Sequence, residues 1–257
     1  MNIAVVAAAL IAAAVSLAPP AEARSLEAIR AGSTLRQCAH PNALPFASRH
    51  AALQGFQIEL GEAIAKQLGL AHEPVWIIGP SQFGRAGCDI VTDAIADTEA
   101  QQESGLQISS PYYRTGVVLA VRDDSPVTSV ATMDRQAKIG VMVGSVAAMT
   151  FRQAGFTTST FGFEDEMLQA LADKEIDAAA VSRAAAGYFS VTHEGKPMHV
   201  VDIDSLAPGL SWNVGVGMVK PDSKLREVVD AALQQLKADG AIQRIYARYG
   251  VTLQPPH

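Results

Sequence analysis

The chain has 257 residues, of which 49% are hydrophobic and 18% charged, and its formal net charge at pH 7 is −6. This composition is typical of globular proteins and excludes collagen-like, fibrous and disordered chains. The 20 Lys and Arg residues never form a run of three, whereas nucleic-acid binding depends on clustered positive charge. We therefore expect no nucleic-acid partner.

Residues 1–23 have the features of a secretory signal peptide. Residues 3–17 are almost wholly Ala, Val, Ile and Leu, and a small-residue cleavage pattern follows at Ala21-Glu22-Ala23. An apolar run of about 15 residues falls short of the roughly 20 needed to cross a bilayer. A membrane anchor is the alternative, because no Lys or Arg precedes the run. We expect a cleaved, periplasmic protein with no part embedded in the membrane.

The first half of the remaining chain alternates helices and strands. A short helical spacing at Leu26 and Ile29 comes first. A longer helix is indicated by apolar residues at every fourth position that stop before Gly69. These residues are Phe56, Leu60, Ile64 and Leu68. Strands are expected over residues 34–39, 75–78 and 88–91.

The same alternation returns in the second half. Strands are expected over residues 138–143 and 177–181, and a helix over 146–153. Another helix opens at Glu164 with three acidic residues, which favour the positive end of a helix dipole. The C-terminal region predicts a long helix that begins near Ser223 and breaks at Gly240, followed by a short one.

Alternating strands and helices predict an α/β fold with mainly parallel sheets. Two extended segments, 117–122 and 212–220, lie where the chain would cross between two lobes. We expect one lobe to be formed by residues 24–119 and 216–257, and the second by residues 120–215.

The two cysteines, Cys38 and Cys88, leave their pairing open. An exported compartment permits a disulfide. Because Cys38 lies late in one expected strand and Cys88 opens another, their Cα atoms could be farther apart than the about 7 Å that a disulfide tolerates. A reactive thiol is not expected, since no cluster of His, Lys or Arg adjoins either cysteine.

Motifs of catalysis are missing from the sequence. It contains no phosphate-binding loop, dinucleotide fingerprint, nucleophile elbow or H-E-x-x-H motif. His193 and His199 flank an expected loop without the further ligands that a metal needs. A secreted hydrolase would need Ser145 to converge with one of these histidines, and the spacing gives no support for that. We expect no enzyme, no cofactor and no metal site.

Two features point to binding instead. Gly144-Ser145-Val146 lies at a strand-to-helix junction, where free backbone N–H groups favour an anion, although Ser145 as a plain helix cap is the alternative. Phe46, Tyr112 and Tyr113 lie in expected loops. Aromatic residues in loops are common in ligand clefts, and packing in a core or hinge is the alternative.

Several segments together resemble the family 3 periplasmic solute-binding proteins of ABC transporters. These segments include Leu44-Pro45-Phe46, Gln54-Gly55-Phe56 and Ser109-Ser110-Pro111-Tyr112-Tyr113. The resemblance implies a type II binding-protein fold, in which two α/β lobes are joined by two hinge strands and each lobe has a mainly parallel sheet flanked by helices. It also implies a small polar solute in the cleft between the lobes, closure on binding, and an ABC transporter permease as partner.

Other segments look most like a narrower group within that family. They include Cys38-Ala39-His40-Pro41, Gly87-Cys88-Asp89-Ile90-Val91 and Tyr249-Gly250-Val251-Thr252-Leu253. This group is the J-type proteins associated with PQQ-dependent methanol dehydrogenases. The resemblance implies an alternative function, an accessory or maturation protein that binds a periplasmic quinoprotein dehydrogenase.

The ligand-binding positions that the resemblance implies depart from those of amino-acid binders. They are Phe46, Asp93, Gln102, Tyr112, Tyr113, Ser145 and Ser182. The family's arginine, which pairs with a ligand carboxylate, is replaced by Gln102, and its aspartate for the ligand ammonium by Ser182. A charged ligand would lose its solvation without gaining a partner. We expect standard amino acids to bind poorly or not at all.

Overall fold

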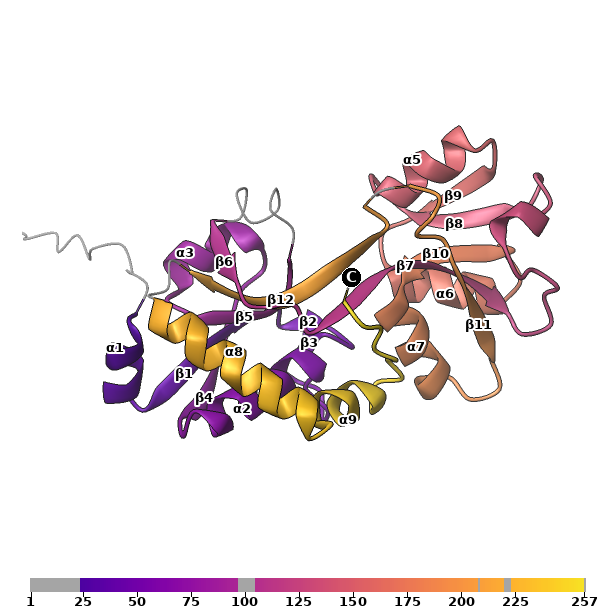
Figure 1. Ribbon diagram of the computed structural model, residues 1–257. Helices are drawn as coiled ribbons and strands as arrows, with labels where there is room; N and C mark the ends of the chain where they lie inside the picture. The colour runs from indigo at the N-terminus through magenta and orange to yellow at the C-terminus, as the bar shows by residue number, and fades with distance from the viewer. Residues whose placement is uncertain (1–23, 97–104, 208, 220–222, 257) are drawn as a thin grey trace, which may run out of the picture.

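The computed structural model of the chain describes residues 24–96, 105–207, 209–219 and 223–256. Two lobes lie side by side and are joined by two long strands, β7 (Tyr113–Arg122) and β12 (Ser211–Val219) (Figure 1). The predicted signal peptide lies outside the described residues. No helix in the described part of the chain combines the length and the apolar character that a bilayer crossing requires.

The first lobe is built on a sheet in the order β4-β1-β5-β12, with β6 paired to β12. Strand β1 pairs in parallel with β4 and β5, whereas β12 pairs antiparallel with β5. The strands of this lobe are β1 (Thr34–Ala39), β4 (Ala71–Trp76), β5 (Ile90–Ile95) and β6 (Leu106–Ile108), with a small ribbon of β2 (Asn42–Ala43) and β3 (Ala47–Ser48). Its helices are α1 (Leu26–Ala31), α2 (Phe56–Gln67), α3 (Phe83–Ala86), α8 (Ser223–Ala238) and α9 (Ala241–Ala247).

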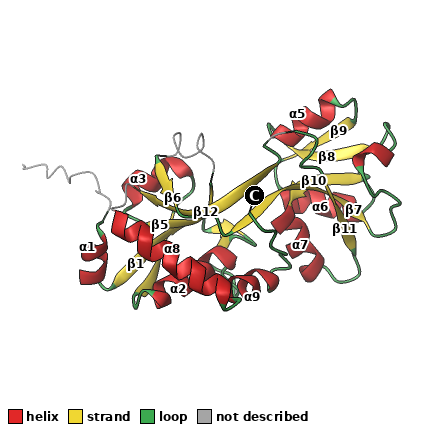
Figure 2. Cartoon of the chain, in the orientation of Figure 1, coloured by secondary structure: helices red, strands yellow, loops and turns green. Residues whose placement is uncertain are grey.

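The second lobe continues the sheet in the order β7-β10-β8-β9, with β11 paired to β7. Strands β10, β8 and β9 are parallel, and β7 is antiparallel to β10 and β11. The strands of this lobe are β8 (Lys138–Met142), β9 (Thr157–Phe161), β10 (Ala178–Ser182) and β11 (Met198–Asp202). Its helices are α5 (Val146–Gln153), α6 (Glu164–Ala172) and α7 (Arg183–Thr192), and Figure 2 shows them around the strands.

The directions of the strands determine which edges of the two sheets face each other. Strand β12 leaves the second lobe at Ser211, which pairs with Gly116, and enters the first lobe, where Met218 pairs with Ile90. Because β5 is antiparallel to β12, β5 and its parallel neighbours β1 and β4 end toward the second lobe. Strand β7 runs the opposite way and is antiparallel to β10, so β8, β9 and β10 end toward the first lobe. The carboxyl ends of both parallel sets therefore face each other.

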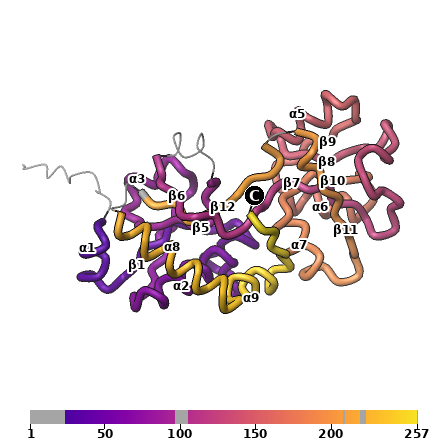
Figure 3. Tube along the Cα trace, in the orientation of Figure 1, coloured from indigo at the N-terminus to yellow at the C-terminus, as the bar shows by residue number. Residues whose placement is uncertain are grey.

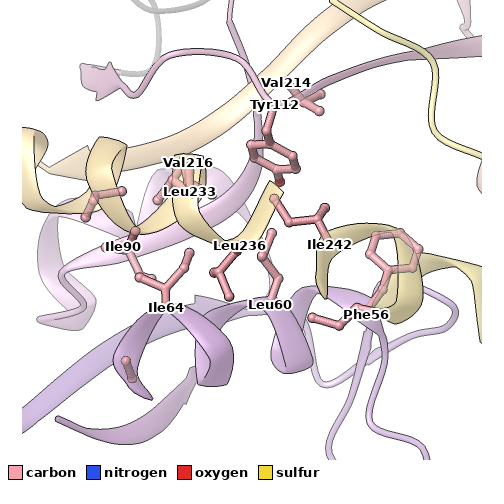
Figure 4. Packing of buried hydrophobic residues seen from close by; sticks show 14 of the residues in the cluster. Phe56, Leu60, Ile64, Ile90, Tyr112, Val214, Val216, Leu233, Leu236 and Ile242 are labelled. Carbon is pink, nitrogen blue, oxygen red and sulfur yellow. The ribbon is translucent and has the colours of Figure 1, made fainter. Parts of the chain in front are cut away.

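Each lobe has its own apolar core. In the first lobe, the expected stripe of α2 is buried, with Phe56, Leu60 and Ile64 packed against α8 and α9 (Figure 4). The second lobe has one cluster on each face of its sheet, centred on Phe151 and on Met167. Gly55 leads into α2 with a φ of 101°, and a Cβ there would lie 2.3 Å from the carbonyl oxygen of Phe46. Only glycine fits this turn.

The predicted α/β class with two lobes and two hinge strands is confirmed, and some element boundaries differ. Strand β4 begins at Ala71 rather than at residue 75, because its backbone pairs with β1 from Thr34 onward. Pro74 fits there because β4 is an edge strand. Helix α7 and strand β9 have no counterpart among the expected elements.

The two long strands pair with each other only over a short stretch near their beginnings. Strand β7 pairs with β12 over residues 113–116, and from residue 117 onward it pairs with β10 inside the second lobe. Strand β12 is already paired with β5 at Val214. The lobe boundaries expected after residues 119 and 215 stay predictions.

The open question of the cysteines has a clear structural answer. Cys38 and Cys88 form a disulfide with a Cα–Cα distance of 5.4 Å, within the range that the bond tolerates. The two strands are direct neighbours, since Gln37 of β1 pairs with Ile90 of β5. The concern that the two strands hold the cysteines too far apart is therefore wrong.

The C-terminal segment makes a third connection between the lobes. The backbone N–H of Arg114 in β7 donates to the carbonyl of Gln254 at 2.9 Å. Gly250 also lies against Gly187 of α7, where a Cβ on Gly187 would be only 2.2 Å from the Gly250 carbonyl oxygen. Figure 3 shows this yellow segment passing from α9 alongside α7. The C-terminal segment thus contacts α7 of the second lobe, in addition to the connections through β7 and β12.

Replacing both Cys38 and Cys88 by Ser is expected to lower the free energy of unfolding by about 2–4 kcal/mol. The reason is that the bond spans a sequence separation of 50 residues, which it constrains in the unfolded chain. Urea unfolding followed by circular dichroism, with and without reductant, measures the effect. Reductant should move the wild-type curve and leave the double variant unchanged. Identical wild-type curves after full reduction would contradict the prediction.

Gly187→Ala is expected to destabilise the protein by about 1–3 kcal/mol, because the added methyl group meets the backbone of Gly250 and either segment must shift. Gly84→Ala is the matched control, since Gly84 lies in α3 with open space around its Cα. Urea unfolding should show that the control is as stable as the wild type or slightly more so. Equal stability of Gly187→Ala and the wild type would disprove the close contact.

Candidate functional site

The opposed carboxyl ends of the two parallel sets form the candidate site. In open α/β sheets, ligands bind in the crevice outside the carboxyl ends of the strands. Ser145 follows β8 and Ser182 ends β10, while Asp93 lies near the end of β5. The structure therefore brings three of the predicted positions to these edges. Gln102 lies outside the described residues.

Asp93 occupies an irregular position in the ladder between β5 and β12. The register shifts between Gly215 and Gly217, so that β5 has one residue more than β12 at this point and Asp93 lies in a bulge of β5. Asp93 adopts a φ of 56°, a conformation that non-glycine residues rarely take. Its backbone N–H donates to the Tyr112 hydroxyl at 3.1 Å.

Two tyrosine hydroxyls hold the Asp93 carboxylate. Tyr112 Oη donates to Asp93 Oδ1 at 2.5 Å and Tyr246 Oη donates to the same oxygen at 2.6 Å. Asp93 Oδ2 is buried and has no hydrogen-bond partner within the described part of the chain. Burial raises the pKa of Asp93 above its usual value, and the bonds from Tyr112 and Tyr246 offset part of that rise. Burial also raises the pKa of both tyrosines, and the nearby Asp93 charge adds to it.

The predicted aromatic positions lie in the core of the first lobe rather than at an open surface. Tyr112 is 5% exposed and Tyr113 is 3% exposed, and both rings belong to the main cluster of that lobe. Phe46 is half-buried, with its ring centroid 5.1 Å from that of Phe56. This burial matches the core-packing alternative, and a role of Tyr112 and Tyr113 in a ligand cleft stays a prediction. Their hydroxyl-bearing rings pack the core, and Tyr112 also positions Asp93.

Ser145 and Ser182 both cap helices at the edge of the second lobe. Ser145 Oγ accepts from the backbone N–H of Ala148 at 3.1 Å, and Ser182 Oγ accepts from that of Ala185 at 3.1 Å. The capping alternative for Ser145 is therefore present in the structure. Ser182 Oγ also donates to Glu164 Oε2 at 2.8 Å.

Glu164 is a half-buried carboxylate for which the sequence pattern indicated only a helix-dipole role. It accepts from the Ser182 backbone N–H at 2.5 Å in addition to the Ser182 hydroxyl. Burial raises the pKa of Glu164, and the two bonds from Ser182 offset part of that rise. The Ser182 hydroxyl is thus engaged at both its donor and its acceptor side.

Two arginines at the second lobe's edge and hinge are paired within the chain. Arg183, directly after β10, forms an ion pair with Asp202 at the end of β11. Arg114 in β7 donates to Asp204 at 3.0 Å. Both pairs join residues far apart in the sequence, which is why no local pattern predicted them.

His193 and His199 both lie against backbone carbonyl groups. His199 Nε2 lies 3.0 Å from the carbonyl oxygen of Val127, and His193 Nδ1 lies 3.2 Å from that of Phe189. Neither is bonded to Ser145, whose hydroxyl caps α5. Among the described residues, no group of three or more His, Cys, Asp or Glu side chains is arranged to hold a metal ion.

The family of bacterial extracellular solute-binding proteins, family 3, matches residues 35–252 of the chain. The chain belongs to this family. The resemblance inferred from the sequence is thereby confirmed at the level of the family.

Curated relatives are similar over most of their length. A probable histidine-binding protein of Neisseria gonorrhoeae is 21% identical, over 85% of this chain and 83% of its own. A glutamine-binding protein of an ABC transporter from Bacillus subtilis is 23% identical, over 77% of this chain and 72% of its own. The relatives are binding proteins by name.

Solved structures share the fold. An ancestral cationic amino-acid solute-binding protein has a TM-score of 0.74 and 23% identity, covering 87% of this chain and 98% of its own. The periplasmic binding protein XoxJ from Methylobacterium extorquens AM1 has a TM-score of 0.67 and 23% identity, covering 85% of this chain and 98% of its own. At such identities the likeness supports the two-lobed architecture alone.

Asp93→Asn is expected to flatten the dependence of stability on pH. The unfolded chain releases this proton near pH 3.8, while the folded chain holds it to a higher pH. The contribution of Asp93 to the free energy of unfolding is therefore fully present below about pH 3.8. It is lost as pH rises through the raised pKa. Asparagine keeps an oxygen acceptor for Tyr112 and Tyr246 but carries no charge.

Urea unfolding at a series of pH values from 4 to 7 measures this effect. The wild type should lose more stability over that range than Asp93→Asn does. The exposed turn substitution Asp123→Asn serves as control and should follow the wild type. Parallel curves for Asp93→Asn and the wild type would show that the buried carboxylate does not titrate as expected.

Proposed function

We propose that the chain is a non-enzymatic periplasmic solute-binding protein that takes a small solute other than a standard amino acid between its lobes. The family membership and the opposed carboxyl edges support the binding role. The predicted signal peptide at residues 1–23 and the family support export to the periplasm. Closure of the two lobes about β7 and β12 would enclose the solute.

The observation that carries this proposal is that Ser182 and Arg183, at the second lobe's edge, are bonded to other groups of the protein. Ser182 stands where amino-acid binders have their ammonium-binding aspartate, and its hydroxyl is engaged by Glu164 and Ala185. The neighbouring Arg183 is paired with Asp202. At Ser182 itself a zwitterionic ligand would therefore lose solvation of its ammonium group without meeting the carboxylate that amino-acid binders place there.

The partner that follows from this role is an ABC transporter permease. The glutamine-binding relative is named as part of such a transporter. In this reading the closed, solute-loaded protein is the form that the permease recognises, because only closure brings surfaces of both lobes into one fixed arrangement.

A second candidate is an accessory protein that binds a periplasmic quinoprotein dehydrogenase. It is favoured by the short segments shared with J-type proteins and by XoxJ among the structural neighbours. The absence of ligand-binding charges at Ser182 fits this role too, since an accessory protein needs no amino-acid site. Size-exclusion chromatography of the chain mixed with such a dehydrogenase separates the two candidates.

The mature chain is expected to bind no standard amino acid, as tested by isothermal titration calorimetry. A panel of small organic acids, amides, alcohols and polyols is expected to contain a ligand that raises the midpoint of thermal unfolding. A ligand at a hundred times its Kd adds about 2.7 kcal/mol, which corresponds to a rise of roughly 5–10 °C for a chain of this size.

Micromolar binding of any standard amino acid would overturn the proposed ligand class. If no solute in the panel raises the midpoint and a stable complex with the dehydrogenase forms, the accessory role replaces solute binding. A solute that raises the midpoint supports the proposed function.

A further inference from the structure

Large apolar side chains are exposed at the two edges that face each other. On the first lobe, Ile78 follows β4 and is 70% exposed, and Ile95 ends β5. On the second lobe, Val143 follows β8 and is 69% exposed, and Phe163 follows β9 and is 65% exposed. Single exposed apolar side chains are common on protein surfaces, so these four indicate a site only together with the pocket beside Ile78.

Several charged groups at the same edges are bonded within the protein. Arg183 is paired with Asp202, Arg114 donates to Asp204, and the half-buried Glu164 is bonded by Ser182. One pocket, beside Ile78, is lined by no Asp, Glu, Lys or Arg side chain. A ligand that matches it carries no net charge on the part that is enclosed.

A pocket of about 240 Å³ lies at the edge of the first lobe. It is bounded by the ends of β1 and β4, by α3 and by the first turn of α2. Its lining includes Ala39, His40, Gln57, Ile77, Ile78 and Phe83. A dry cavity of about 150 Å³ takes up a benzene molecule, so this pocket has room for one substituted ring or a branched aliphatic group.

His40 supplies a hydrogen-bond donor in this apolar lining. The backbone N–H of Asn42 donates to His40 Nδ1 at 3.1 Å, which makes Nδ1 the acceptor. In the neutral imidazole the proton is then on Nε2. That N–H can donate to a carbonyl or hydroxyl oxygen of a ligand, and a few placed polar groups in an apolar pocket set the ligand's orientation.

We propose that this pocket binds an uncharged molecule with an apolar ring or branched chain and one hydrogen-bond-accepting oxygen, and that Phe163 and Val143 of the second lobe cover it on closure. The proposal rests on the proposed function, because it names the ligand class of the site between the lobes. Ile78 and Phe163 are its central contacts, one from each lobe.

The test uses a set of probes that share size and differ in charge. Benzyl alcohol and cyclohexanol are the neutral probes, benzoate and benzylamine are the charged ones, and phenylalanine is the zwitterion. Calorimetric titration of the mature chain should give a Kd at least tenfold lower for a neutral probe than for the charged probes of the same ring. Tenfold corresponds to about 1.4 kcal/mol.

Ile78→Ser and Phe163→Ser should each weaken binding of the neutral probe at least fivefold. Both side chains are exposed, so thermal unfolding of the variants should match the wild type. Val200→Ser is the matched control, since Val200 is exposed in the middle of the edge strand β11 and away from the facing edges. It should bind the probe as the wild type does.

Three results would overturn the proposal. The first is equal or tighter binding of the charged probes, and the second is unchanged binding by both serine variants. The third is no binding of neutral probes together with loss of a dehydrogenase complex in Phe163→Ser, which would assign the apolar edges to a protein partner. If a polar solute binds while neutral probes do not, the ligand class is wrong and the proposed function stands.

Discussion

The antiparallel pairing of β7 with β12 is the constraint on which the rest of the structure depends. Four residue pairs, from Ser211–Gly116 to Val214–Tyr113, join the strands at the crossing between the lobes. Because β7 and β12 run in opposite directions, each one orients the parallel strands of the lobe that it enters. The two carboxyl edges then face each other, and the site between them follows from strand direction, while the contact of Gly250 with α7 adds a further link between the lobes.

The acid–tyrosine cluster links this hinge to the core of the first lobe. Tyr112 directly precedes β7, Asp93 lies in β5 at the facing edge, and Tyr246 belongs to α9. One carboxylate oxygen accepts from both hydroxyls, so the start of the hinge strand, the edge of the sheet and the C-terminal helix are fixed to one another. A buried carboxylate costs solvation energy. The bonds from Tyr112 and Tyr246 offset part of that cost and hold the irregular backbone at Asp93 in one position.

Local patterns were enough to predict much of the fold. The spacing of Phe56, Leu60 and Ile64 predicted α2 because a helix buries every third or fourth residue, and α5 matched its expected bounds. Helix α7 escaped prediction since its alanine-rich sequence carries no distinct apolar stripe. Strand β9 escaped because Thr and Ser dominate it and its exposed pattern does not alternate.

Less of the candidate site could be predicted from the sequence, because its residues are distant in the chain and come together only in the folded structure. Ser145 and Ser182 were identified by position, but the half-buried Glu164 beside Ser182 comes from a segment 18 residues away. Arg114 and Asp204 are 90 residues apart. The burial of Tyr112 and Tyr113 depends on α9, which packs against them from the far end of the chain. Such contacts have no signature in local spacing.

The pairing of Gln254 with Arg114 has a practical consequence for handling the protein. A tag, fluorophore or fusion partner attached to the C-terminus begins only a few residues beyond the hinge (Figure 3). A bulky attachment there would sit beside the pivot and bias the angle between the lobes, whereas the beginning of α1 lies on the outer side of the first lobe, far from the crossing (Figure 1). A reporter of lobe closure is therefore better attached ahead of α1, where it is far from the hinge strands and does not alter the angle between the lobes.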